Sequence, residues 1–189
     1  MSTPLPGQPG FVLPDPADRP HFERRAVRVL VLDEDERVLL FLDSDLGLDP
    51  VAHWWDTPGG GVDPGESDRE AVVRELAEET GQVVEDADVV GPLFERLVVH
   101  GYSDKVVEQT EVWFAVRRPA FEVDASGYTE EERLCIAETR WWSLADLASA
   151  PDEVWPADLA DLVALVDRPD AWRAGAVAGE PVEESSLPA

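Results

Sequence analysis

Cysteine and basic residues are scarce in this chain of 189 residues. The one cysteine, Cys135, excludes an intramolecular disulfide and fits a reducing compartment. Only 15 lysines and arginines stand against 41 aspartates and glutamates, which gives a formal net charge of −26. Such a surface repels nucleic-acid backbones and anionic lipids, so we expect no non-specific nucleic-acid partner.

Long apolar runs are absent as well. No run approaches the roughly 18 residues of a membrane span, and the first residues lack the basic start and apolar centre of a secretion signal. We therefore expect no membrane partner and a cytoplasmic location.

What is present indicates one folded domain with two appendages. The hydrophobic fraction of 44% and the seven tryptophans are typical of a globular core. Residues 1–20 contain six prolines, which preclude a regular helix and predict an extended arm. Residues 21–168 form the predicted domain, and residues 169–189 are predicted to be an acidic, flexible tail. Apolar residues 11–13 of the arm could contact the body or a second subunit, which leaves a homodimer open.

The apolar and β-branched residues predict an alternation of strands and helices. Strands are predicted at 24–32, 38–42, 53–58, 89–100, 110–116 and 136–142. Helices are predicted at 68–80 and 144–148, with a last one after Trp155-Pro156. The polar segments 43–52, 101–108 and 121–133 are predicted to be loops, the first of them on the rim of an active site.

The helix predicted at 68–80 has the clearest boundaries. Ser67 and Glu70 form a capping-box signature at its start, and Gly81 suits the position after its end. Its apolar residues repeat at helical spacing, while Glu75, Glu78 and Glu79 fall on the other side. By residue type alone these acids indicate a solvated helix face. They also repel one another, and a hard divalent cation would turn that repulsion into coordination.

The spacing around the helix favours the cation. From Gly60 the chain fits the pattern G-x5-E-x7-R-E-U-x-E-E-x-G-U, where U is apolar, and only the last position departs, because Gln82 replaces the apolar residue. The matching positions are Gly60, Glu66, Arg74, Glu75, Leu76, Glu78, Glu79 and Gly81. This pattern is the Nudix box, and the chain resembles the Nudix hydrolases, of which MutT is an example.

The resemblance implies an α/β fold of the Nudix type, an α-β-α sandwich with a mixed sheet. It also implies hydrolysis of a pyrophosphate linked to a nucleoside, with Mg²⁺ or Mn²⁺ as the cofactor. Carried over by position, Glu75, Glu78 and Glu79 are catalytic and metal-binding residues, with the Gly60 backbone beside the metal. Arg74 would orient a helix carboxylate, while Glu66 and Gly81 would hold the motif in shape.

Outside the motif the candidates for substrate contact are weaker. The resemblance directs attention to the strand after the box helix, which carries Glu95 and Arg96, and to acids in the loop before the last strand. Basic residues near a polyanionic substrate come next, and then ring-stacking groups, although each of these also suits an ordinary core or surface position. The candidates are Arg24, Arg25, Arg28, His53, Trp54, Glu95, Arg96 and Glu111, with Glu131 or Glu132 as an extra acid.

The expected substrate is a nucleoside diphosphate linked to another group, with a nucleoside triphosphate first. An ADP-ribose or nucleotide-sugar pyrophosphatase is the alternative. A nucleotide-binding module without catalysis would be expected to lose box acids, and all are present here. Isomerase chemistry on an isoprenoid diphosphate would need a cysteine in the cleft, whereas the sequence predicts Cys135 to be a buried structural thiol.

Overall fold

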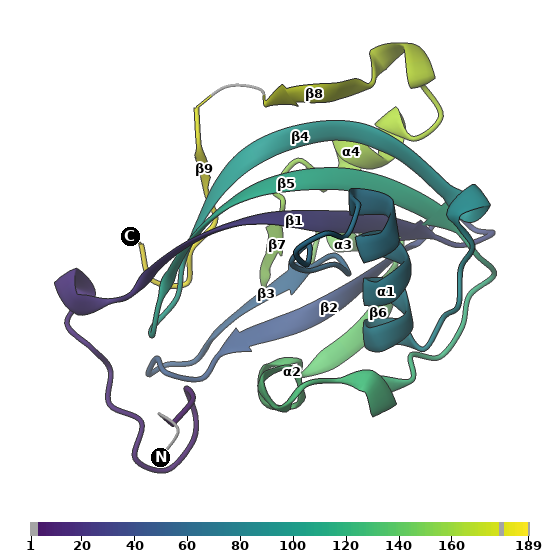
Figure 1. The fold of residues 1–189 in the computed structure, drawn as a ribbon. Coiled ribbons are helices and arrows are strands. Elements are labelled where there is room, and N and C mark those ends of the chain that lie inside the picture. The colour runs from purple at the N-terminus through teal and green to yellow at the C-terminus, as the bar shows by residue number, and fades with distance from the viewer. Residues whose placement is uncertain (1–3, 178–179, 189) are drawn as a thin grey trace.

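The computed structural model describes residues 4–177 and 180–188, and within them the strands form one curled sheet (Figure 1). The order is β7-β3-β2-β1-β5-β4-β8, with β6 on β2 and β9 on β4. The strands are β1 (His21–Leu32), β2 (Val38–Asp45), β3 (Ala52–Asp56), β4 (Val89–Gly101), β5 (Val106–Arg117), β6 (Glu138–Trp142), β7 (Glu153–Trp155), β8 (Arg173–Val177) and β9 (Val182–Glu183). The α-helices are α1 (Asp68–Thr80), α2 (Glu130–Cys135), α3 (Leu144–Leu147) and α4 (Leu159–Leu165). Short 3-10 turns lie at η1 (Pro16–Asp18), η2 (Asp86–Asp88), η3 (Ala125–Gly127) and η4 (Pro169–Ala171).

The sheet divides into two halves that share little more than a turn. β1 pairs in parallel with β5 along its whole length, and β5 pairs antiparallel with β4. In contrast, the β1–β2 register contains only the Leu32–Val38 pair. The half formed by β2, β3 and β6 therefore diverges from the half formed by β1, β5 and β4 (Figure 1). The space between the halves is where a cleft can form.

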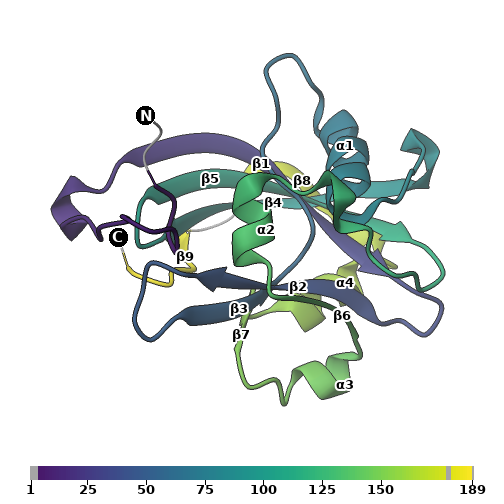
Figure 2. The ribbon, with the colours of Figure 1, turned by 90° about the horizontal axis from the view of Figure 1, so that it is seen from below.

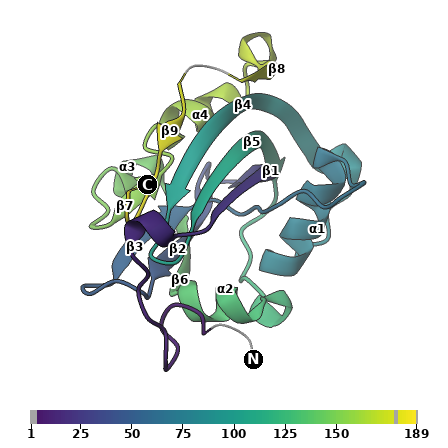
Figure 3. The ribbon, with the colours of Figure 1, turned by 60° about the vertical axis from the view of Figure 1, so that its left-hand side comes forward.

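Helices cover both faces of this sheet (Figure 3). Alternate residues of β1 point to opposite sides, so Val27 and Val29 join the core under α1, while Leu30 and Leu32 join the core that contains α4. Parallel and antiparallel pairs occur together. The predicted α/β sandwich with a mixed sheet is confirmed.

Helix α1 has the predicted ends. The Ser67 side chain accepts a hydrogen bond from the Glu70 amide, and the Glu70 carboxylate accepts one from the Ser67 amide. Gly81 adopts a left-handed conformation with φ 72°, and its amide donates to the Ala77 carbonyl. These interactions are local, which is why the sequence could predict them.

Two predicted loops are shorter than expected. The β4–β5 connection is a tight turn closed by a hydrogen bond from the Tyr102 amide to the Lys105 carbonyl, so both strands extend into the predicted loop 101–108. The predicted loop 121–133 contains most of α2, because Thr129 and Glu132 form a second capping box. The acidic run at the start of α2 is therefore helical and not part of the predicted loop.

The two ends of the chain are tied to the body. The segment after Arg168, expected to be a flexible tail, forms β8 and β9 beside β4 (Figure 1). The Arg19 guanidinium donates to the carbonyls of Tyr102, Leu187 and Pro188 at 3.0, 2.9 and 2.6 Å. Within residues 4–177 and 180–188, no helix is long and apolar enough to cross a membrane.

The proline-rich arm also folds onto the body. Gly7 lies against the Leu46 side chain, and the Phe11 ring lies against Gly47. The Gln8 side chain donates to a Glu130 carboxylate oxygen at 3.0 Å, which joins the arm to α2 (Figure 3). Of the apolar residues expected to hold the arm, Phe11 makes a contact, while Val12 is 80% exposed.

Candidate active site

A cleft of about 320 Å³ opens between the two halves of the sheet, and residues of α2 line it. In the ribbon, α2 lies between β1 and β2 (Figure 2). One end is formed by α1 and the segment before it, which supply Glu75, Glu79 and Gly59–Gly61. The other end is formed by the arm, the end of β2, the β4–β5 turn and α2. These segments are far apart in the sequence, so the curled sheet is what assembles the cleft.

Two box carboxylates are buried in the wall of this cleft. Glu75 and Glu79 are each 7% exposed, whereas Glu78 lies on the solvent side of α1. Burial raises the pKa of Glu79 well above its usual range, the Glu75 charge raises it further, and a hydrogen bond from the Gly59 amide at 2.8 Å opposes the shift. Burial also raises the pKa of Glu75, while Arg74 lowers it. The acids therefore do not form one solvated face.

Arg74 connects the motif. Its guanidinium lies 2.9 Å from a Glu66 carboxylate oxygen, 2.8 Å from Glu75 and 3.1 Å from Glu78, and it donates to the Gly61 carbonyl at 2.8 Å. One arginine thus holds the loop, the helix and the Glu75 side chain in a fixed relation. The geometry agrees with the orienting role that the resemblance implies for Arg74 and with the loop-holding role of Glu66.

The glycine segment leaves room for the Glu75 carboxylate beside the Gly60 backbone. A Cβ on Gly60 would lie 2.5 Å from a Glu75 carboxylate oxygen, while the Gly60 carbonyl accepts from the Val27 amide at 2.9 Å. No group of three or more acidic, histidine or cysteine side chains already converges as a ligand set in the part of the chain that the structure describes. The available donors are carboxylate and carbonyl oxygens, which are the donors that Mg²⁺ prefers, so the residues fit a hard divalent cation.

Replacing Gly60 by alanine should separate activity from folding. The new methyl group displaces the flexible end of Glu75, so we expect turnover to fall by about 10- to 100-fold. The melting temperature should change little, because the Gly60 backbone is not in the left-handed region. Gly59→Ala is the contrasting variant: with φ +140° its Cβ would collide with the Val27 carbonyl, and the fold should suffer. Equal losses of stability in both variants would contradict this account.

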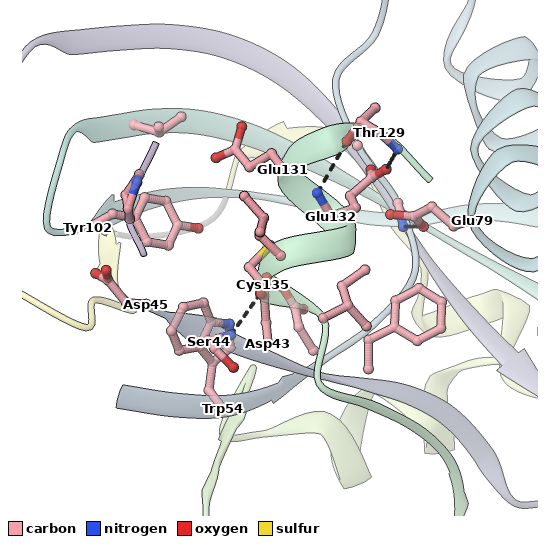
Figure 4. A pocket seen from close by; sticks show the side chains of 18 of the residues that line it. Asp43, Ser44, Asp45, Trp54, Glu79, Tyr102, Thr129, Glu131, Glu132 and Cys135 are labelled. Atoms are coloured by element: carbon pink, nitrogen blue, oxygen red, sulfur yellow. Dashed lines mark hydrogen bonds between the residues drawn. The ribbon is translucent and has the colours of Figure 1, made fainter. Parts of the chain in front are cut away.

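Helix α2 adds two acids to the cleft wall. Glu132 lies on the side that faces Glu79, and Glu131 lies on the side toward Tyr102 (Figure 4). The Glu132 charge raises the pKa of both Glu75 and Glu79, although its carboxylate also accepts from the Thr129 amide at 2.7 Å. Glu131 forms an ion pair with Lys105 at 2.6 Å. Of the two candidates, Glu132 is therefore the better placed extra acid.

The far end of the cleft combines rings and polar groups. Trp54 and Tyr102 line it, and Trp54 stacks on Trp155 with ring centroids 4.3 Å apart. Leu5 from the arm completes the apolar part of the wall. His53 does not line the cleft: its exposed ring contacts Ser44 Oγ through Nδ1 at 2.9 Å. Trp54 is thus the member of the predicted aromatic pair that a bound ring could meet.

Four candidates for substrate contact lie elsewhere, and this corrects the sequence-based expectation. Arg25 pairs with Asp68 and Glu95 at 2.7 and 3.4 Å, on the α1 face of the sheet. Glu111 is 0% exposed, and Arg96 bonds to it at 2.7 Å. Sequence spacing could place Glu111 on one face of its strand but could not show that this face is covered.

The covering element is the end of the chain. Glu184, just after β9, is 7% exposed and binds Arg96 through two bonds of 2.7 Å. Arg28 lies on the other side of Glu111 at 3.1 Å, and it also pairs with Asp56 at 2.9 Å and donates to the Thr57 carbonyl at 3.1 Å. A buried ionic network therefore runs from the tail to Asp56 and Thr57, close before the glycine segment.

Asp56 gives this network a measurable pH dependence. Burial raises the pKa of Asp56 to about 6; Arg28 lowers it, Glu111 and Glu184 raise it, and His100 lowers it. Because the folded state holds this proton more tightly, the contribution of Asp56 to stability is present at low pH and is lost as the pH rises through about 6. Asp56→Asn removes that loss, so its melting temperature should gain on the wild type between pH 5 and pH 8. A constant difference across this range would contradict the prediction.

Cys135 ends α2 and lines the cleft, whereas the sequence predicts a buried structural thiol. Burial and the nearby Asp43 carboxylate raise the pKa of the Cys135 thiol far above its ordinary value. The thiol is therefore protonated and is unsuited to act as a nucleophile.

Several cleft residues were not among the candidates named from the sequence. Asp43 falls in the loop predicted on the rim of the active site, whereas Tyr102, Asp104 and Lys105 fall in a segment predicted only as a loop. The turn between β4 and β5 brings the last three of these residues to the cleft, and Lys105 there contacts Glu131 of α2, 26 residues away in the sequence. Of the basic residues considered, Arg24 and Arg28 reach the cleft.

Comparisons with known proteins agree with this architecture. The sequence profile described as the NUDIX domain matches residues 22–163. A Bacillus subtilis (strain 168) protein named as a candidate 8-oxo-dGTP diphosphatase is 53% identical over 53 residues, which are 28% of this chain and 32% of that relative. The chain thus spans about a third of that relative's length.

Longer matches lead to the same family. An RNA pyrophosphohydrolase of Brucella ovis is 30% identical over 169 residues, covering 78% of this chain and 86% of the relative. Among solved structures, the MutT protein from Methanosarcina mazei Go1 is 26% identical with a TM-score of 0.51, covering 81% of this chain and 97% of that one. The profile match covers well over half of this chain, and the chain therefore belongs to the NUDIX domain family.

Proposed function

We propose that the protein is a hydrolase that uses Mg²⁺, or Mn²⁺ in its place, to cleave a pyrophosphate bond in a nucleoside diphosphate linked to another group. The observation that carries the proposal is the pair of buried carboxylates, Glu75 and Glu79, facing the glycine segment inside a cleft. Buried, mutually repelling carboxylates are costly to maintain unless they bind a cation.

The metal would be held by Glu75 and Glu79, with Glu78 and the Gly60 backbone as further oxygen donors. When bound, it would neutralise phosphate charge and lower the pKa of water. The protein fixes the positions of the two buried carboxylates: Arg74 holds Glu75, and the Gly59 amide holds Glu79. Glu132 would add a third acid near the reacting end of the cleft.

A nucleoside triphosphate is the first proposed substrate. Trp54 and Tyr102 form part of the wall at the end of the cleft away from the box acids, and an aromatic wall suits a base or sugar. The relative named as a candidate 8-oxo-dGTP diphosphatase supports an oxidised nucleotide within this class. The other named relative acts on RNA, but a net charge of −26 opposes the approach of a long polyanion.

A phosphate-release screen with Mg²⁺ tests the function directly. The panel contains nucleoside triphosphates with 8-oxo-dGTP, ADP-ribose, nucleotide sugars, dinucleoside polyphosphates and 5′-triphosphate RNA, each with and without alkaline phosphatase. Pyrophosphate release from a triphosphate is the expected result. Phosphatase-dependent release from ADP-ribose alone would replace the proposed substrate by the alternative. Silence across the panel, with metal bound, would favour a binding module without catalysis.

A further inference from the structure

Three basic side chains line the cleft, and they differ in whether an acidic side chain neutralises their charge. Arg28 pairs with Asp56 and Glu111 at 2.9 and 3.1 Å. Lys105 pairs with Glu131 at 2.6 Å. Arg24 forms no ion pair with any residue within 4–177 and 180–188, although the protein has 41 acidic residues. Its positive charge is therefore the one that remains available to an anion in the cleft.

The position of Arg24 suits a phosphate. Its side chain is accessible to solvent, and its guanidinium lies along Gly61, 3.8 Å from where a Cβ on that residue would be. It therefore stands beside the glycine segment that faces the box acids. Partial desolvation and repulsion by Arg28 lower the pKa of Arg24, effects that a bound anion would offset.

Gln109 fixes the direction of this guanidinium. The Arg24 Nε donates to the Gln109 Oε1 at 2.8 Å, while the Gln109 Nε2 donates to Glu111 at 2.7 Å and lies 3.0 Å from His100 Nε2. Gln109 is 0% exposed, and because its amide nitrogen has Glu111 as an acceptor, its oxygen must face Arg24. The contact uses Nε, and no hydrogen bond joins the two terminal nitrogens to any of the residues that the structure describes.

The chemical identity of residue 109 matters as much as its position. A carboxylate there would form an ion pair with Arg24 and neutralise it, whereas an amide orients the guanidinium without cancelling its charge. Behind Gln109 stand Glu111, Arg96 and Glu184, so the orienting group is itself anchored in the buried network.

We propose that Arg24 binds the phosphates of the substrate through its terminal nitrogens and that Gln109 is the positioning residue that directs them into the cleft. The inference rests on the proposed function, because it assigns the anion-binding residue of the same cleft. It concerns binding, so the Michaelis constant should change more than the turnover number.

The test measures binding of methylenediphosphonate, a diphosphate analogue without an anhydride bond, together with nucleotide kinetics. Arg24→Met should weaken analogue binding and raise KM by about 10- to 100-fold, because hydrogen bonds to charged groups are among the stronger ones. Arg24→Lys should recover part of the loss. Arg25→Met is the matched control: it removes the neighbouring charge on the opposite face of β1 and should leave both quantities unchanged.

Gln109→Met tests the positioning role, since it keeps the size of the side chain and removes the acceptor. Analogue binding should weaken by about 3- to 10-fold, and the double variant with Arg24→Met should be no weaker than Arg24→Met alone. Additive losses would mean that Gln109 acts only through the fold, and this would overturn its assignment.

The outcomes separate this inference from the proposed function. Analogue binding that is equal in Arg24→Met, Arg25→Met and the wild type overturns the role of Arg24, even if nucleotides are hydrolysed. Binding that depends on Arg24, in a protein that hydrolyses no nucleotide, supports the anion site and removes the enzymatic proposal. A wild type that neither binds the analogue nor hydrolyses a nucleotide overturns both.

Discussion

Replacing Glu79 by glutamine is expected to lower the turnover number by about 10²- to 10³-fold, because a bound metal supplies several kcal/mol of transition-state stabilisation and each 1.4 kcal/mol is about tenfold in rate. Glutamine keeps the size of the side chain and can still accept from the Gly59 amide. The substitution removes the negative charge that would bind a cation. Turnover with saturating Mg²⁺ and metal binding by calorimetry are the measurements.

The same variant should be more stable than the wild type without metal. The pKa of Glu79 is raised by burial and by Glu75, so the wild type loses stability as the pH rises through that value, and the glutamine variant does not. The gain in melting temperature should therefore grow with pH and disappear when Mg²⁺ saturates the wild type. Glu108→Gln, at an exposed position on β5, is the control for lost charge. An active Glu79→Gln enzyme would refute the assigned role.

Arg28→Met is expected to have the largest effect on folding. Arg28 is 8% exposed and is the cation between Asp56 and Glu111, so its loss leaves two buried carboxylates short of a partner. Removing one member of a buried pair typically costs about 3–5 kcal/mol, a large part of the stability of a domain this size. Denaturant unfolding at pH 7.5 measures the effect.

Two comparisons make this prediction specific. Arg25→Met removes an exposed pair with Asp68, for which about 1 kcal/mol or less is expected. Adding Asp56→Asn to Arg28→Met should recover part of the loss, because one uncompensated charge disappears. If Arg28→Met is no more destabilising than Arg25→Met, the buried network does not support the fold in the way described.

Local signals account for what the sequence could predict. Helix α1 and its caps depend on contacts within 15 residues, from Ser67 to Gly81, and both ends are where the pattern places them. The motif spacing in turn located Glu75, Glu79 and Arg74, which the structure brings together at one end of the cleft. Site residues that lie in one continuous stretch of the sequence can therefore be predicted from that stretch.

Contacts between distant parts of the chain account for what the sequence could not predict. Arg96 and Glu111 were candidates for the cleft because the sequence gives no sign that Glu184, 88 residues after Arg96, covers them. The tail has few large apolar residues, so its burial depends on β4 and on ionic partners, which no periodic pattern reveals. For the same reason the arm and the β4–β5 turn could not be assigned to the cleft.

The arm also has an evolutionary consequence. Leu5 and Pro6 form part of the cleft wall, and Gln8 ties the arm to α2 through Glu130, yet none of these residues lies in the loop–helix that carries the box acids. The part of the cleft wall that the arm supplies and the proposed metal-binding acids thus reside on separate stretches of the sequence. Under the proposed function, mutations at residues 5–8 are expected to change substrate preference without touching the box acids, so this segment is a natural target for directed diversification.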